Sequence, residues 1–303
     1  MKNIKKSVLL SLIAAMTIWS MSFIWTKQAF VVFSPITTIF LRLIVSSILI
    51  FGYLHFTKQF QKIEKRDYFW ILLLGILEPF LYFMGESFGL QLIPSTLASV
   101  IICTIPLFTP LLGFIVFRER MTYMNVAGIV ISVIGVMVMV VDKNLSLNAP
   151  LKGILLMGLA VFSATCYALV LKHLSHRYSG YSIVAYQNTV GIFLFLPFFT
   201  FNEWSTFIST PVTFSAVSAV IMLAVFASTV AFILYTHGIK DLGVTKASAF
   251  VNLIPVLTAI FAWFILDEQI GWRKIFGIAI VISGLFASQF KNKEQDDIRP
   301  FEA

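Results

Sequence analysis

ASVIICTIPLFTPLLGFIVFRE, at residues 98–119, returns as ASAFVNLIPVLTAIFAWFILDE at residues 247–268. The two stretches share one register, in which each residue lies 149 positions (247 minus 98) before its counterpart. The matched pairs are Ala98/Ala247, Ser99/Ser248, Ile105/Ile254, Pro106/Pro255, Thr109/Thr258 and Glu119/Glu268, followed by Gly128/Gly277, Ile131/Ile280 and Gly135/Gly284. Chance readily matches Leu with Ile, but it seldom matches Pro, Gly, Ser and Glu in one register. We therefore interpret the chain as an internal duplication.

The composition of the chain is that of a membrane protein. Of its 303 residues, 59% are hydrophobic and 12% are charged, whereas soluble domains carry about 25% charged residues. Apolar runs of about 20 residues recur along the chain, as the thickness of a bilayer core requires of a helix. They predict ten spans, at residues 7–27, 35–55, 67–89, 94–117, 122–141, 151–172, 179–200, 212–237, 244–266 and 271–290.

The duplicated unit contains five predicted spans, and an odd number makes the second copy enter the membrane from the opposite face. We predict an all-α integral membrane protein with ten transmembrane helices in two inverted five-helix repeats, at residues 1–145 and 146–290. Residues 291–303 would form a disordered cytoplasmic tail. Lys and Arg gather in the loops on the side of the amino terminus, which places both termini in the cytoplasm. The same loops account for the net charge of +8 without any nucleic-acid partner.

The chain resembles the EamA-type branch of the drug/metabolite transporter superfamily. The resemblance lies in TIWSMSFIWTK (residues 17–27), SPITTIFLRL (34–43) and the duplicated block, which continues as RERMTYMNVAGIVISVIGV and DEQIGWRKIFGIAIVISGL. It implies an inverted-repeat transporter of the cell membrane, with the first four helices of each half around a central cavity and the fifth packed outside. Such proteins move amino acids, other small metabolites or drugs, and many are thought to be exporters.

Glu78 lies near the middle of the third predicted span. An ionised carboxylate at that depth costs about 2.5 to 3.5 kcal/mol on insertion scales, so Glu78 should face the protein interior or be protonated. It is a candidate proton-coupling group or a partner for a substrate amine, with Tyr82 and Gly85 on the same helix face. The alternative is a protonated side chain bonded to nearby backbone. The second half carries no acid at the corresponding positions, where Ala227, Ala231 and Tyr235 replace Glu78, Tyr82 and Glu86.

Arg42 lies roughly 10 Å inside the outer end of the second span, and Glu86 lies at a similar depth in the third. An unpaired arginine at that depth is costly, so we expect the two side chains to face one another. The pair acts either as a gate that breaks during transport or as a static ion pair, and the static pair is favoured.

Further polar and aromatic residues recur inside the spans. Trp19 and Ser22 lie at helical spacing on the first span and form either a cavity wall or packing. Gln187, Ser248 and Asn252 are either interhelical hydrogen-bonding groups or substrate ligands. Pro106, Pro110 and Pro255 should kink their helices, and the matched glycines should be packing surfaces. Glu119 and Glu268 should cap the following helix or pair with Arg120 and Arg273.

These features favour a secondary transporter of small organic metabolites, with a small-molecule substrate, protons as a possible second partner, lipid around it and no cofactor. The chain lacks the G-x-x-x-x-G-K-[ST] motif of ATP-binding proteins. No nucleophile is paired with a histidine base, so we do not expect an enzyme. A passive channel and a lipid scramblase remain alternatives. For an amino acid, we expect the ammonium at Glu78 and the carboxylate at Asn252 or Gln187.

Overall fold

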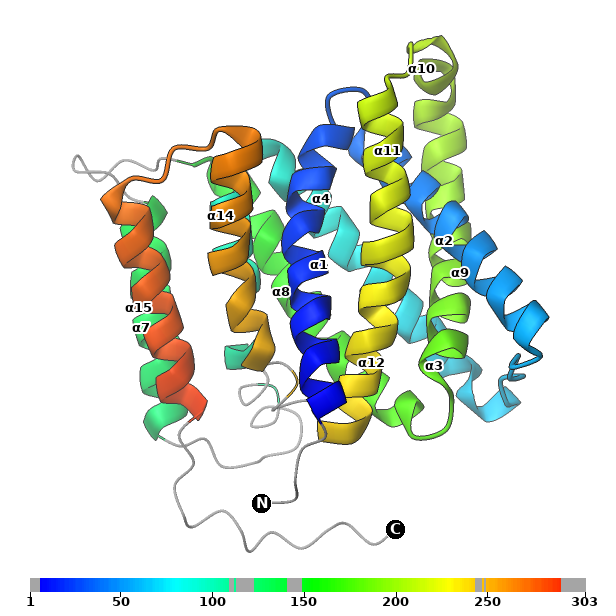
Figure 1. Ribbon diagram of the computed structural model, residues 1–303, viewed down its shortest axis with the longest axis horizontal. Helices are drawn as coiled ribbons and strands as arrows, with labels where there is room; N and C mark the ends of the chain where they lie inside the picture. The colour runs from blue at the N-terminus through cyan, green and yellow to red at the C-terminus, as the bar shows by residue number, and fades with distance from the viewer. Residues whose placement is uncertain are drawn as a thin grey trace, which may run out of the picture.

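The computed structural model of the protein describes residues 6–108, 112, 123–140, 149–242, 247 and 249–289. Each secondary-structure element in this part of the chain is a helix, and the long helices stand side by side (Figure 1). In chain order they are α1 Lys6–Ala29, α2 Pro35–Thr57, η1 Lys65–Asp67, α3 Tyr68–Gly75, η2 Ile76–Leu81, α4 Tyr82–Leu92, α5 Ser95–Ile102, α7 Tyr123–Val140, α8 Leu151–Ser175, α9 Gly180–Phe198, η3 Phe199–Glu203, α10 Trp204–Ser209, α11 Phe214–Met222, η4 Leu223–Val230, α12 Ala231–Leu242, η5 Ala249–Leu253, α14 Ile254–Leu266 and α15 Trp272–Gln289.

Six helical segments in the described part are long and apolar enough to cross a membrane. They are Lys6–Ala29, Pro35–Thr57, Lys65–Leu92, Leu151–Ser175, Gly180–Ser209 and Phe214–Leu242. Shorter apolar helices follow at Ser95–Phe108, Val126–Val140 and Phe250–Leu266. The all-helical, multi-pass class is thus confirmed, while the count of ten spans stays a prediction. Pro110, Glu119, Arg120, Ser248 and the predicted tail at residues 291–303 lie outside the described residues.

Interruptions of the helices recur in the register of the sequence duplication. The third span contains a segment of π-helix, η2 (Ile76–Leu81). The positions 149 residues later are 225–230, and they lie inside the π-helical η4 (Leu223–Val230). The α-helix preceding Pro106 ends at Ile102, and the 3₁₀ segment preceding Pro255 ends at Leu253. Proline removes a backbone donor and clashes with the preceding turn, so a break at this point is expected in both halves.

Glycines let α7 and α15 approach closely. A Cβ atom added to Gly135 would lie 2.9 Å from the carbonyl oxygen of Gly277, and one added to Gly284 would lie 2.7 Å from that of Gly128. The predicted role of these four glycines as packing surfaces is confirmed. Residue numbers rise along one helix as they fall along the other, so α7 and α15 run antiparallel.

In each half of the chain, the helix of the third predicted span packs on the helix of the first predicted span of the other half. Gly89 on α4 lies against Met157 and Gly153 on α8, and Gly238 on α12, its counterpart at the same offset, lies against Leu12 on α1. Two equivalent contacts of this kind place α1, α4, α8 and α12 around a common centre.

We expect Gly85→Ala to destabilise the protein. The added methyl group would lie 2.5 Å from the Leu156 carbonyl oxygen and 2.8 Å from the Ala160 nitrogen, so α4 and α8 would have to separate. Overpacking of this kind costs about 1 to 3 kcal/mol. Gly158→Ala on α8 is the matched control, because nothing lies within 4 Å of its added Cβ. Thermal unfolding in detergent should show a lower midpoint for Gly85→Ala only; equal midpoints would contradict the packing described.

Polar residues connect the loops at one end of the bundle. Asp67, 1% exposed, accepts hydrogen bonds of 2.7 Å from the Arg177 guanidinium and of 2.7 Å from the Tyr178 hydroxyl. The Ser179 amide also donates to the Gln61 side chain at 2.7 Å. The segment between α2 and α3 is thereby tied to the segment between α8 and α9.

Asp67→Asn should lower the free energy of unfolding by about 1 to 3 kcal/mol. The substitution removes the charge that Arg177 pairs with and leaves one amide oxygen for two donors. Asp241→Asn changes an exposed pair, with 3.5 Å between Asp241 and His237, so it should shift stability by less than about 0.5 kcal/mol. Denaturation midpoints of the two variants provide the comparison, and an equal loss in both would refute a structural role for Asp67.

The two predicted roles of Glu268, capping the following helix or pairing with Arg273, are wrong. Its carboxylate accepts bonds from the backbone amides of Ser95 (2.8 Å) and Thr96 (3.3 Å) and from the Thr96 hydroxyl (2.8 Å), at the start of α5. It therefore caps a helix of the other half, not the helix that follows it, and its partner is not Arg273. Unpaired amides at a helix amino terminus attract a carboxylate from any part of the chain that reaches them.

Candidate functional site

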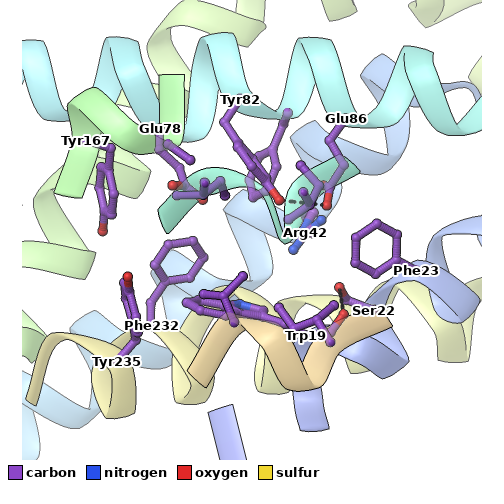
Figure 2. A pocket seen from close by; sticks show the side chains of 16 residues that line it. Trp19, Ser22, Phe23, Arg42, Glu78, Tyr82, Glu86, Tyr167, Phe232 and Tyr235 are labelled. Carbon is purple, nitrogen blue, oxygen red and sulfur yellow. Dashed lines mark hydrogen bonds between the residues drawn. The ribbon is translucent and has the colours of Figure 1, made fainter. Parts of the chain in front are cut away.

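A cavity lies at the centre formed by α1, α4, α8 and α12 (Figure 2). Side chains from both halves line it: Trp19, Ser22, Phe23, Arg42, Glu78, Tyr82, Phe83, Glu86, Ile102 and Ile105 from the first, and Ala164, Tyr167, Phe232, Tyr235, Val251 and Ile254 from the second. Six of the residues singled out in the sequence, Trp19, Ser22, Arg42, Glu78, Tyr82 and Glu86, are thus brought together.

Glu78 reaches the cavity because its helix is interrupted there. Its φ and ψ of −146° and 123° are extended, while the flanking segments α3 and α4 are helical. Pro79 follows, and the Ser163 hydroxyl on α8 donates to the Leu77 carbonyl at 2.6 Å, which satisfies an acceptor freed by the break. The side chain of Glu78 is 5% exposed, and its carboxyl makes no hydrogen bond to any residue that the structure describes. It is therefore available to a ligand in the cavity.

Arg42 is held by the second half of the chain. Its Nε donates to the Ser228 hydroxyl on η4 at 2.7 Å, and its guanidinium carbon lies 4.2 Å from the centre of the Phe83 ring. Next to it, the Asn188 amide donates to the Ser46 hydroxyl, which lies 2.6 Å from the Thr229 hydroxyl. These contacts fix Arg42 at the wall of the cavity between α2 and η4.

Arg42 and Glu86 share the cavity but make no direct ion pair. Among the described residues, the ion pairs within 4.0 Å are Arg66–Glu64, Arg177–Asp67 and His237–Asp241. Instead, Glu86 accepts a hydrogen bond of 3.0 Å from the Tyr82 hydroxyl, one helical turn before it. Both side chains line the same cavity, and Figure 2 draws them at the same end of it, beside Tyr82.

Aromatic rings form the wall opposite Glu78. The Trp19 indole packs edge-on against Phe232 and Tyr235, with ring centres 5.2 and 5.0 Å apart, and its Nε1 donates to the Ala227 carbonyl at 3.3 Å. Tyr167 packs edge-on against Phe232 at 6.2 Å. Such a wall suits the apolar part of a small organic molecule, and ring faces also attract cations.

Two predicted residues, Gln187 and Asn252, do not line the cavity. Gln187 stands behind the cavity, where its side-chain oxygen accepts a 3.1 Å bond from the Tyr167 hydroxyl. Asn252 is 7% exposed and does not belong to the lining; neither polar atom of its side chain has a partner among the described residues. Ser248 lies outside the described residues. Gln187 therefore positions a cavity residue instead of facing the cavity itself.

Tyr167, Phe232 and Ser228 were not predicted from the sequence as residues of the site. The 149-residue offset contains a signal for part of the second-half wall: it pairs Phe83 with Phe232, Glu86 with Tyr235, Ile102 with Val251 and Ile105 with Ile254, and all eight line the cavity. No pattern in the sequence points to Tyr167 or to the contact of Ser228 with Arg42. Within the described residues, no group of three or more His, Cys, Asp or Glu side chains is placed to hold a metal ion.

A family model, curated relatives and a solved structure all match this chain. The model of the EamA-like transporter family matches residues 6–141 and 151–289. Uncharacterized transporter YetK of Bacillus subtilis strain 168 is 28% identical over 260 residues, which cover 84% of this chain and 78% of that protein. An uncharacterized transporter of Archaeoglobus fulgidus is 24% identical over 296 residues, covering 96% of this chain and all (100%) of the relative. A crystal structure with 17% sequence identity shares the fold, with a TM-score of 0.70 over 94% of this chain and 97% of the other.

Proposed function

We propose, because the chain belongs to the EamA-like transporter family, that it is a secondary active transporter that exports small organic metabolites, amino acids among them. The protein is a multi-pass membrane protein, and its relatives are transporters by name. The observation that carries the proposal is Glu78: a buried carboxyl without a hydrogen-bond partner in the described structure, at a broken helix, in an aromatic cavity between the halves.

Transport would proceed by alternating access between two inverted five-helix repeats, residues 1–145 and 146–290. The shared register of the helix interruptions, the antiparallel packing of α7 on α15 and the equivalent contacts of Gly89 and Gly238 support this arrangement. In transporters of this architecture the substrate binds near the bilayer midplane between the repeats, often at a discontinuous helix. Rocking of one half against the other would expose the cavity to each side in turn.

A substrate amine would bind at Glu78, and a proton would replace it when the substrate leaves. A carboxylate costs much in an apolar cavity unless it carries a proton or meets a cation, so the two ligands exclude each other. Moving one charge across 100 mV is worth about 2.3 kcal/mol, enough for one proton to drive export. Since Gln187 is bonded to Tyr167 and Asn252 lies off the lining, we assign the binding of a substrate anion to Arg42 instead.

Both termini would lie in the cytoplasm, with the protein in the cell membrane. The loops before α3 and before α9 are predicted on the cytoplasmic side by their Lys and Arg content. The bonds of Asp67 to Arg177 and Tyr178 join these two loops, which supports the predicted topology because both loops must lie on one face.

Counterflow in proteoliposomes tests the proposal against a passive channel and a lipid scramblase. Vesicles loaded with an unlabelled amine-bearing solute should accumulate the labelled solute transiently above equilibrium if the protein is a carrier. A channel would equilibrate the label without any overshoot. A scramblase would move a fluorescent lipid between leaflets, which is measured in the same vesicles. Absence of an overshoot across a panel of amino acids and other metabolites would refute the proposal.

A further inference from the structure

Glu268 joins the two halves of the chain at one end of the bundle. Its carboxylate accepts hydrogen bonds from the Ser95 amide (2.8 Å), the Thr96 amide (3.3 Å) and the Thr96 hydroxyl (2.8 Å). Ser95 and Thr96 are fully buried, with 0% exposure each. We call these three bonds the Glu268 contact. Hydrogen bonds to a charged group at a helix amino terminus are among the stronger polar contacts of a protein.

The backbone of Glu268 is bonded to α14, so its carboxylate moves with that helix. α14 ends at Leu266, and Asp267 follows in the left-handed conformation, with a φ of 53°. The Glu268 amide then donates to the Ala262 carbonyl at 3.1 Å. This bond is the one that commonly closes a helix ending in a left-handed residue. The Glu268 contact therefore holds α14 against the start of α5.

α5 and α14 also form part of the cavity wall. The two helices pack against each other. Ile102, at the end of α5, and Ile254, at the start of α14, both line the cavity. Ser95 precedes Ile102 by seven positions (102 minus 95), which is about two helical turns. Separation of α5 from α14 at the Glu268 contact would therefore open a path towards the cavity.

A second contact between the halves lies at the opposite end of the bundle, where Asp67 bonds to Arg177 and Tyr178. In Figure 1 α14 ends at the top of the bundle, whereas α3, which follows Asp67, begins near the bottom. The predicted topology places the Asp67 end in the cytoplasm, so Glu268 lies at the outer end. Alternating access requires contacts at one end to separate while those at the other persist.

We infer that Glu268 closes the cavity towards the outside, and that its bonds to Ser95 and Thr96 break before the cavity opens to that side. This rests on the proposed function, for which it names a gating residue. In the closed form the Ser95 and Thr96 amides are buried and donate to the carboxylate. In the open form water reaches them and replaces it as the acceptor. Loss of the carboxylate therefore costs the closed form more than the open form.

Labelling of a cysteine in the cavity measures this opening without depending on transport. Ser22→Cys places a thiol in the lining, and Cys103→Ala with Cys166→Ala removes the two native thiols. A membrane-impermeant methanethiosulfonate reagent is applied to intact cells and, separately, to inside-out vesicles. We expect Glu268→Gln to raise the rate of labelling from outside by about tenfold, since bonds to a charged group are lost. An unchanged rate from outside, or a rise from the cytoplasmic side alone, would overturn the inference.

Two further variants locate the effect. Asp67→Asn removes the charge of the contact at the opposite end, so labelling from outside should stay at the wild-type rate or fall. Thr96→Val removes one bond of the Glu268 contact, so its rate should lie between those of the wild type and Glu268→Gln. A rise in Asp67→Asn equal to that in Glu268→Gln would show general loosening of the bundle and would overturn the inference.

Failure of the inference and failure of the proposed function are distinguishable. Faster labelling of the Glu268→Gln variant, together with no counterflow in the wild type, would refute a carrier but leave the closure by Glu268 intact. Counterflow in the wild type, together with unchanged labelling of the variant, would do the opposite.

Discussion

Replacement of Glu78 by Gln is expected to lower kcat/KM for uptake of an amine-bearing substrate by about thirtyfold or more. Gln has nearly the size of Glu, so the interrupted helix can keep its shape, but the charge that meets the ammonium is lost. Truncating one partner of a desolvated charge pair costs about 2 to 5 kcal/mol, and each 1.4 kcal/mol is a factor of ten. Because Glu78 is also the proposed proton carrier, the variant should lose the dependence of accumulation on an imposed pH gradient.

Initial rates of labelled-substrate uptake into proteoliposomes measure this effect. Glu86→Gln is the control, since Glu86 is already engaged by Tyr82 and should matter less for the amine. A Glu78→Gln variant that keeps both its rate and its gradient dependence would reduce Glu78 to a structural residue. Equal losses in the two variants would point to the summed charge of the cavity instead of one site.

Arg42→Met should destabilise the protein strongly, and Glu86→Gln should restore much of the loss. Arg42 is 3% exposed, and its removal leaves the buried Glu78 and Glu86 without a neighbouring cation. Removing one partner of a buried set of charges costs about 3 to 5 kcal/mol, which would lower the thermal midpoint by about 5 °C or more. The added Glu86→Gln change removes one of the two uncompensated carboxylates, so the double variant should be more stable than Arg42→Met alone.

A double-mutant cycle of thermal midpoints in detergent measures the coupling between Arg42 and Glu86. Purely additive effects would show that the two charges do not stabilise one another, and the cavity electrostatics described above would then be wrong. The cycle also tests the predicted role of the pair. Coupling between the two residues, which make no direct contact, would mean that they stabilise the cavity jointly through Tyr82 and Ser228. It would not indicate a closed ion pair.

The sequence predicted those features that depend on composition or on register. A run of apolar residues must be a helix inside a bilayer, because no water is available there to satisfy the backbone. Glu78 could be identified from the sequence because a lone carboxyl in an apolar run is costly in a bilayer and must face the protein interior or be protonated. The register of the duplication also indicated that the matched glycines are packing surfaces, which the close approach of α7 and α15 confirms.

Features that depend on contacts between distant segments were not predictable. The capping of α5 by Glu268 joins residues 173 positions apart, and the bond from Arg42 to Ser228 joins residues 186 positions apart. Such contacts depend on which helices become neighbours, which a single sequence does not specify. Gln187 illustrates the point: its place in an apolar span allowed either a substrate ligand or an interhelical hydrogen bond, and only the structure shows the hydrogen bond from Tyr167.

The coupling of Glu78 to solute movement is the central claim, and solute-driven proton flux tests it most directly. Proteoliposomes that contain a trapped pH-sensitive dye are given an inward gradient of the solute that shows counterflow, with no pH difference imposed. The account predicts a change in lumenal pH that saturates with solute in the wild type and is absent in Glu78→Gln. Saturable solute movement without a pH change in the wild type, or an equal pH change in both proteins, would contradict it.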